Sequence, residues 1–160
     1  MTEDARFEDA GDRPLRLKAL DAEDLTVIAA LVQDAVLVAS DMVWQPGKRR
    51  FAVLLNRFRW EDAERASRRG GGWERVRSVL AVEDVTAVRS TGVPRGDADT
   101  VLSVLSIGFA PGEDGQGTLT LALAGDGEVA MDVEALEVVL RDVTRPYRAP
   151  SGRAPSHDDA

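Results

Sequence analysis

The sequence contains no cysteine, and its one histidine, His157, stands close to the C-terminus. These two residue types supply the usual nucleophiles, metal ligands and neutral-pH proton carriers of enzymes. We therefore expect no metal and no cofactor. Long hydrophobic runs are also scarce: the longest nearly apolar run, residues 101–110, is far shorter than the roughly 20 residues of a membrane-spanning helix. The N-terminus is acidic and no apolar segment follows it, so we expect no signal peptide, no membrane insertion and a cytoplasmic location.

The net charge of −8 argues against binding to nucleic acid, because neutralising phosphates requires a basic surface. The charge is unevenly distributed, however. Residues 48–77 hold ten Lys or Arg against four acids, a net +6, so the rest of the chain carries −14. Composition otherwise fits one globular domain, with 44% hydrophobic and 30% charged residues. We place it at 14–143, between two disordered tails, 1–13 and 144–160.

The first half of the chain predicts a helix and then a hairpin. Asp21 is a suitable N-cap, and apolar residues at helical spacing predict an amphipathic helix over 22–36. Alternating residues then predict strands over 37–45 and 49–60, joined by a type II turn at Pro46-Gly47. This turn would place Trp44 opposite Arg49. The same alternation would put Arg57 and Arg59 in the core, so we predict a β-bulge or bend near Asn56 that returns them to the surface.

The second half predicts five more strands and a final helix. The strands are expected at 75–82, 85–90, 101–110, 118–124 and 128–131, and apolar spacing predicts a helix over 132–143. The fold class is thus α+β, a mainly antiparallel, seven-stranded bent sheet or half-barrel with an N-terminal and a C-terminal helix. The order of elements over roughly 37–143 resembles the pleckstrin-homology-like superfold. The alternative is a mixed α+β sandwich with both helices on one face of the sheet.

Several short segments resemble an uncharacterised family of alphaproteobacterial proteins that is catalogued as a domain of unknown function. These segments are Leu20-Asp-Ala-Glu-Asp-Leu25, Gln33-Asp-Ala-Val36, Asp41-Met-Val-Trp44, Arg50-Phe51 and Leu55-Asn-Arg-Phe58. The resemblance covers nearly the whole ordered region. It implies a bacterial cytosolic protein, and it supplies no activity, cofactor or catalytic residue.

Basic and aromatic residues gather at the hairpin, and they are the best candidates for a contact surface. Arginine and tryptophan are enriched where proteins bind one another. We therefore predict a non-catalytic protein-binding or scaffold module that contacts an acidic partner, with self-association left open. The predicted patch consists of Trp44, Arg49, Arg50, Arg57, Arg59 and Trp60.

Other polar groupings predict less. The run Arg68-Arg69-Gly70-Gly71-Gly72 offers backbone amides for an anion but lacks the spacing of a P-loop or a dinucleotide fold. Asp41, Glu134 and Glu137 are the carboxylates weighed for acid–base chemistry, and the sequence marks no pocket around them. The alternative function is a small, cofactor-free hydrolase or isomerase that uses Asp, Glu or Arg in a half-barrel cavity.

Overall fold

The computed structural model describes residues 14–62, 74–93 and 99–148. Within them lie one α-helix, α1 (Ala22–Val32), and three short 3₁₀ helices, η2 (Ala39–Asp41), η3 (Pro46–Lys48) and η4 (Trp60–Asp62). The strands are β1 (Arg16–Ala19), β2 (Val36–Val38), β3 (Met42–Gln45), β4 (Arg50–Phe58), β5 (Glu74–Val82), β6 (Val85–Thr91), β7 (Val101–Pro111), β8 (Gly117–Leu123), β9 (Gly127–Val133), β10 (Val138–Asp142) and β11 (Tyr147–Arg148).

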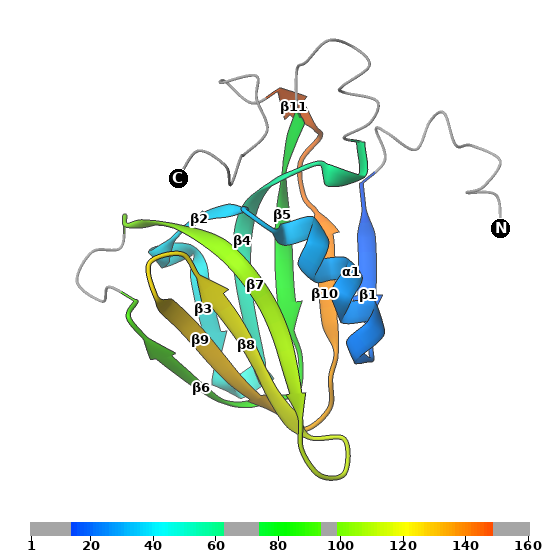
Figure 1. Cartoon of the computed structure of the whole chain (residues 1–160), viewed down its shortest axis with the longest axis vertical. Coiled ribbons are helices and arrows are strands. Elements are labelled where there is room, and N and C mark those ends of the chain that lie inside the picture. The colour runs from blue at the N-terminus through cyan, green and yellow to red at the C-terminus, as the bar shows by residue number, and fades with distance from the viewer. Residues whose placement is uncertain (1–13, 63–73, 94–98, 149–160) are drawn as a thin grey trace, which may run out of the picture.

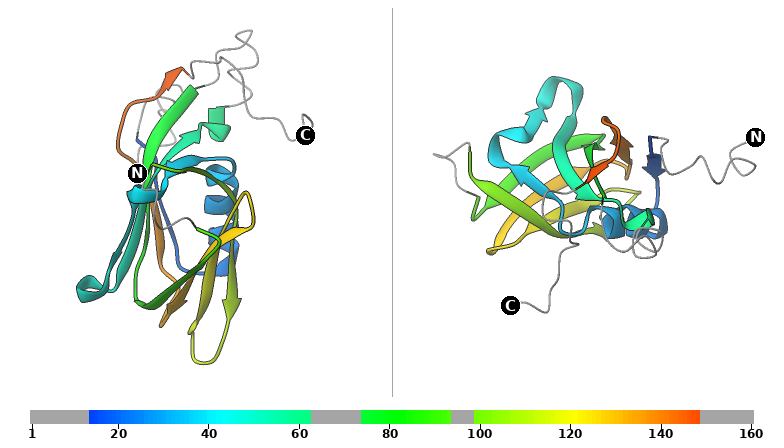
Figure 2. Two further views of the ribbon diagram at one scale, coloured as in Figure 1. Left: turned by 90° about the vertical axis from the view of Figure 1, so that its left-hand side faces the viewer. Right: turned by 90° about the horizontal axis from the view of Figure 1, so that it is seen from above.

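All eleven strands belong to one open, antiparallel sheet with two halves (Figure 1). The first half has the order β1-β10-β5-β4, with β3 paired to β4 and β11 paired to β5. The second half has the order β7-β8-β9-β6, and the three-residue strand β2 joins it to β4. Figure 2 shows from the side how the sheet curves, so that its two halves form facing layers. The prediction of a mainly antiparallel sheet is confirmed, but the predicted count of seven strands is wrong, since the described residues form eleven.

The core lies on the inner face of the curved sheet, where α1 also packs. Leu25, Ile28 and Val32 point from α1 into one cluster with apolar residues of both halves. The predicted cap is present, since the Asp21 carboxylate accepts from the Asp24 N–H at 2.8 Å. The helix ends at Val32, four residues before the predicted boundary, because the chain must extend to form β2.

Most of the predicted strands occur near their expected places, but the strand predicted over 37–45 is divided by η2 into β2 and β3. The predicted two-residue turn is wrong. Residues 46–48 form a 3₁₀ turn and Arg49 adopts a left-handed conformation with φ of 53°, so Gln45 pairs with Arg50. The longer turn shifts the register, and Trp44 lies opposite Phe51 rather than Arg49.

The predicted C-terminal helix over 132–143 is wrong. Residues up to Val133 belong to β9, and Val138–Asp142 form β10 between β1 and β5. Val138 and Leu140 are fully buried whereas Val139 and Arg141 lie on the outer face, which is the two-residue period of a strand. The apolar residues have helical spacing by coincidence. The segment forms a strand because its backbone pairs with β1 on one side and β5 on the other. Without this helix, the structure does not confirm the pleckstrin-homology-like prediction.

The structure describes only some of the residues in the predicted tails and loops. Residues 1–13 and 149–160 lie outside them, and so does the glycine run 70–72. Within the predicted C-terminal tail, β11 pairs with the start of β5, with Tyr147 opposite Arg75.

Candidate functional site

The structure does not bring the six residues of the predicted patch together. Trp44, Arg49 and Arg50 lie at the turn where β4 begins, and Arg57, Arg59 and Trp60 lie at or beyond its other end. Arg50 and Arg57 are seven residues apart on one strand, a separation of about 23 Å at 3.3 Å per residue.

At the turn, Trp44 is partly buried against the core, and both arginines already have acidic partners. Arg49 pairs with Glu134, and the Arg50 Nε donates to Glu83 at 2.9 Å. At the other end, the Trp60 ring nitrogen donates to the Gln33 carbonyl at 3.1 Å. This end of the hairpin is thus held to the chain that follows α1.

Arg57 is fully buried, and the predicted bulge near Asn56 is absent. β4 pairs with β5 in unbroken register from Phe51 to Phe58, so the alternation that seemed to place Arg57 in the core does place it there. Phe58 falls on the outer face but is only 2% exposed, because the Arg75 guanidinium lies 3.9 Å from its ring centre and the Trp60 ring packs beside it.

The buried side chain of Arg57 binds three polar side chains: Ser78 and Asp142, whose side chains are also buried, and Glu61, which lies at the surface. We call these four residues the buried arginine cluster. Both terminal nitrogens of Arg57 donate to Glu61 at 2.9 Å, one also donates to Asp142 at 3.0 Å, and its Nε donates to Ser78 at 3.0 Å. The Ser78 hydroxyl in turn donates to Asp142 at 2.7 Å. The other Asp142 oxygen accepts the Leu15 N–H at 2.9 Å, which fastens the start of β1.

The electrostatics of this cluster favour its charged form. Burial lowers the pKa of Arg57, but the hydrogen bonds and charges of Glu61 and Asp142 outweigh burial and raise that pKa above its ordinary value. Burial likewise raises the pKa of Glu61, and the hydrogen bond and charge of Arg57 overcome it, so the net pKa is lowered. Arg59, 5% exposed, pairs with Asp62 and Glu74. These arginines hold the fold together.

The outer face of the first half of the sheet has a different composition. Six apolar residues there lie in two adjacent cross-strand rows, which we together call the apolar row: Val43, Ala52, Ala81 and Val139 in one, and Leu54 and Val79 in the other. Val43 is exposed and the other five are half-buried. The helix α1 packs against the opposite face. A contiguous apolar patch at the surface is a candidate contact surface.

Three exposed arginines border the apolar row, and we call them the outer arginine row: Arg16, Arg141 and Arg77. Arg16 and Arg141 are register partners on β1 and β10, and Arg141 lies opposite Val79, two residues from Arg77 on β5. No salt bridge joins any of the three to an acid within the described chain. Sequence reasoning missed them because they come from three distant segments, and only the period of β10 identifies Arg141 as outward-facing.

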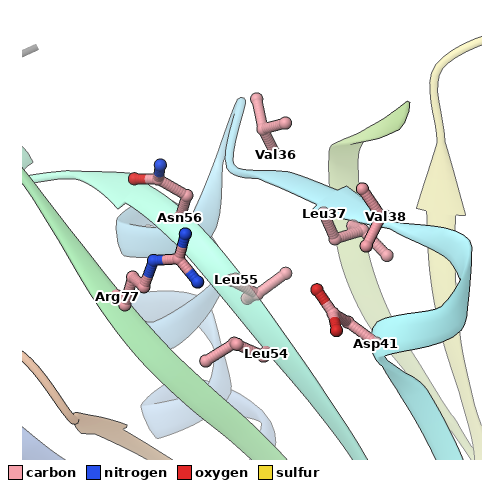
Figure 3. A pocket seen from close by; sticks show the side chains of 8 residues that line it. All are labelled: Val36, Leu37, Val38, Asp41, Leu54, Leu55, Asn56 and Arg77. Atoms are coloured by element: carbon pink, nitrogen blue, oxygen red, sulfur yellow. The ribbon is translucent and has the colours of Figure 1, made fainter. Parts of the chain in front are cut away.

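A small pocket opens at the corner of this face, between β2, η2 and β4. Its volume is about 140 Å³, and its polar lining residues are Asp41, Asn56 and Arg77. Figure 3 shows Asp41 and Arg77 on opposite sides, with Leu54 and Leu55 between them. Of the carboxylates weighed from the sequence, Asp41 alone lines this pocket, whereas Glu134 and Glu137 pair with Arg49 and Lys18.

The described residues hold no group of three or more His, Cys, Asp or Glu side chains arranged for a metal ion. Of the helices in the same part of the chain, none has the length and hydrophobicity that crossing a bilayer requires.

The fold class of the described residues is thus an open antiparallel sheet with one α-helix packed on it. Over residues 15–157 the chain matches the model of a family described as "Protein of unknown function (DUF2948)", and it belongs to that family. This match confirms the resemblance to a domain of unknown function that the short sequence segments indicated. No curated protein matches the chain, and no solved structure does.

Proposed function

We propose that this domain is a non-catalytic protein-binding module, and that it contacts an acidic partner protein through the outer face of β3, β4, β5, β10 and β1. The observation that carries the proposal is the apolar row bordered by three arginines that form no salt bridge with any described acid. Apolar burial supplies the free energy of association, and charge complementarity selects the partner. The proposed surface replaces the predicted patch, in which Arg57 and Arg59 are buried and Arg49 and Arg50 already pair with acids.

Charge favours a different, acidic protein over a second copy of this chain. In a two-fold dimer formed through this face, the same surface meets itself, so the outer arginine rows would approach one another. Like charges at close range oppose such an interface. The net charge of −8 likewise disfavours nucleic acid as the partner.

A bacterial cytosolic setting is a further part of the proposal, and it rests on the sequence resemblance alone. The pleckstrin-homology-like fold is not part of the proposal, because the C-terminal helix expected for it is strand β10 in this structure.

The test compares two triple variants with the same change in charge. Partners captured from source cells by cross-linking are identified, purified and titrated against the wild type and both variants. The face variant is Arg16→Glu/Arg77→Glu/Arg141→Glu, and the control, the turn variant, is Lys48→Glu/Arg49→Glu/Arg50→Glu. We expect the face variant to bind an acidic partner at least about tenfold more weakly, which corresponds to about 1.4 kcal/mol, and the turn variant to bind nearly as the wild type does.

Equal binding by the wild type and the face variant would refute the proposed surface. If only the turn variant bound the partner more weakly, the binding site would instead lie at the basic turn around Arg49 and Arg50. Multiple turnover of a metabolite by the purified chain would favour the alternative, a small hydrolase or isomerase.

A further inference from the structure

The pocket at the corner of the outer face exists because a strand pair opens there. Val36 pairs with Asn56, and Met42 pairs with Val53, so five residues, 37–41, face only two, 54 and 55. Continuing the first register would pair Val38 with Leu54, but the register stops at Val36. The interruption leaves a cavity of about 140 Å³ between the strands.

The main chain of Val38 and Leu54 borders this cavity with its polar groups. Arg59 N donates to Glu74 O at 3.0 Å, so the odd-numbered residues along β4 bond to β5 and the even-numbered Leu54 faces β2. Ala39 N donates to Thr100 O at 2.9 Å, so Val38 faces β4 by the same alternation. Because the two residues do not pair in the ladder, hydrogen-bonding groups of both strands point toward the opening.

Side chains of opposite charge line the same cavity without neutralising each other. Asp41 and Arg77 form no salt bridge with each other or with any other described residue. Asn56, the third polar residue of the lining, lies beside Arg77.

Size and apolar contacts narrow the ligand further. A cavity of about 150 Å³ holds a molecule the size of benzene, so this one admits a ligand with on the order of six to eight non-hydrogen atoms. Leu54 and Leu55 lie between the charged groups, and Val36 and Val38 add further aliphatic surface to the lining. The ligand must therefore be small, partly apolar, and charged at both ends.

We propose that this pocket binds a small zwitterionic amino acid, with its ammonium group at Asp41 and its carboxylate at Arg77. Charge-assisted hydrogen bonds at both ends fix the orientation of the ligand. The inference goes beyond the proposed protein-binding function and does not depend on it.

The test titrates L-valine, β-alanine and γ-aminobutyrate, which differ in the spacing of their charges, into the full ¹⁵N-labelled chain. We expect at least one of them to shift the amide signals of Val38 and Leu54 with a Kd on the order of 1 mM. Asp41→Asn and Arg77→Gln should each weaken that binding at least about tenfold, a change of about 1.4 kcal/mol in binding free energy. Arg141→Gln, a matched loss of charge on the same face, should leave it unchanged.

Ligands that lack one charge test the same claim on the unaltered protein. For the zwitterion that binds, two analogues keep its carbon chain but only one of its charged groups; for L-valine they are isobutylamine and 3-methylbutanoate. Each should bind at least about tenfold more weakly than that zwitterion. Equal binding of these analogues, equal weakening by Arg141→Gln, or no shift with any zwitterion up to about 50 mM would overturn the proposal. No partner is present in this experiment, so its failure leaves the protein-binding proposal intact.

Discussion

Arg57 and Arg77 lie on neighbouring strands, yet the molecule uses them in opposite ways. Arg57 points to the inner face and is fully buried, with carboxylates from Glu61 and Asp142 around its guanidinium. Arg77 points to the outer face, is exposed, and makes no salt bridge within the described chain. The positions of the acids decide which arginine maintains the fold and which remains accessible to a ligand or partner.

Removing the buried arginine should have the largest effect. Arg57→Met keeps much of the side-chain volume but leaves Glu61 and Asp142 without their counter-charge, which costs about 3–5 kcal/mol of unfolding free energy. Urea denaturation of the wild type and the variant measures it. Arg77→Met is the matched control and should change stability by no more than about 0.5 kcal/mol. Similar losses for both variants would mean that the distinction between the two faces is wrong.

The buried arginine cluster should also make stability depend on pH. The pKa of Glu61 is lower in the folded chain than its ordinary value of 4.5. The stability it contributes is therefore present above pH 4.5 and is lost as the pH falls further, because the unfolded chain then binds more protons. We expect the difference in unfolding free energy between the wild type and Glu61→Gln to shrink as the pH is lowered from about 7 to about 3. A difference that stays constant over this range would show that Glu61 is not ionised in the folded state.

The smallest effect is expected in the outer arginine row. Arg16 on β1 and Arg141 on the adjacent strand β10 lie directly opposite each other, and like charges in such a pair are destabilising. Arg141→Glu replaces repulsion with attraction and should stabilise the fold by a few tenths of a kcal/mol, up to about 1. Arg141→Gln should give a smaller gain. Thermal melts at low salt and at about 1 M salt should show the gain vanishing as the charges are screened; a gain unaffected by salt would have another cause.

The strand pattern was predictable from the sequence because local alternation largely determines it. β4, β5, β7, β8 and β9 begin and end within a few residues of the expected places. The error at Arg57 has a physical reason. A prediction from hydrophobic alternation assumes that arginine lies at the surface. Asp142, which pairs with Arg57, is 85 residues away in the chain. No local pattern reveals that a distant carboxylate compensates the burial.

The helix prediction for the C-terminal segment was wrong for a related reason. Its apolar residues fit a helix and a strand equally well over residues 133–143, and only the presence of two strands in need of a partner decides between them. The pocket was also beyond prediction, because it arises from the mismatch between the registers of β2 and β3 on β4. Of its polar lining, Asp41 alone was noticed in the sequence.

The pairing of β1 with β10 has a consequence for the order in which the chain folds during its synthesis. β1 has β10 as its one strand partner among the described residues, and β10 ends at Asp142. After Ala19 the ribosome must add 142 − 19 = 123 residues before this partner is complete. At 5–20 residues per second, that takes roughly 6–25 s. Throughout this interval β1 has no partner, and Leu15 lacks the carboxylate of Asp142 that later holds it. The domain therefore closes late, when nearly the whole described chain has been made.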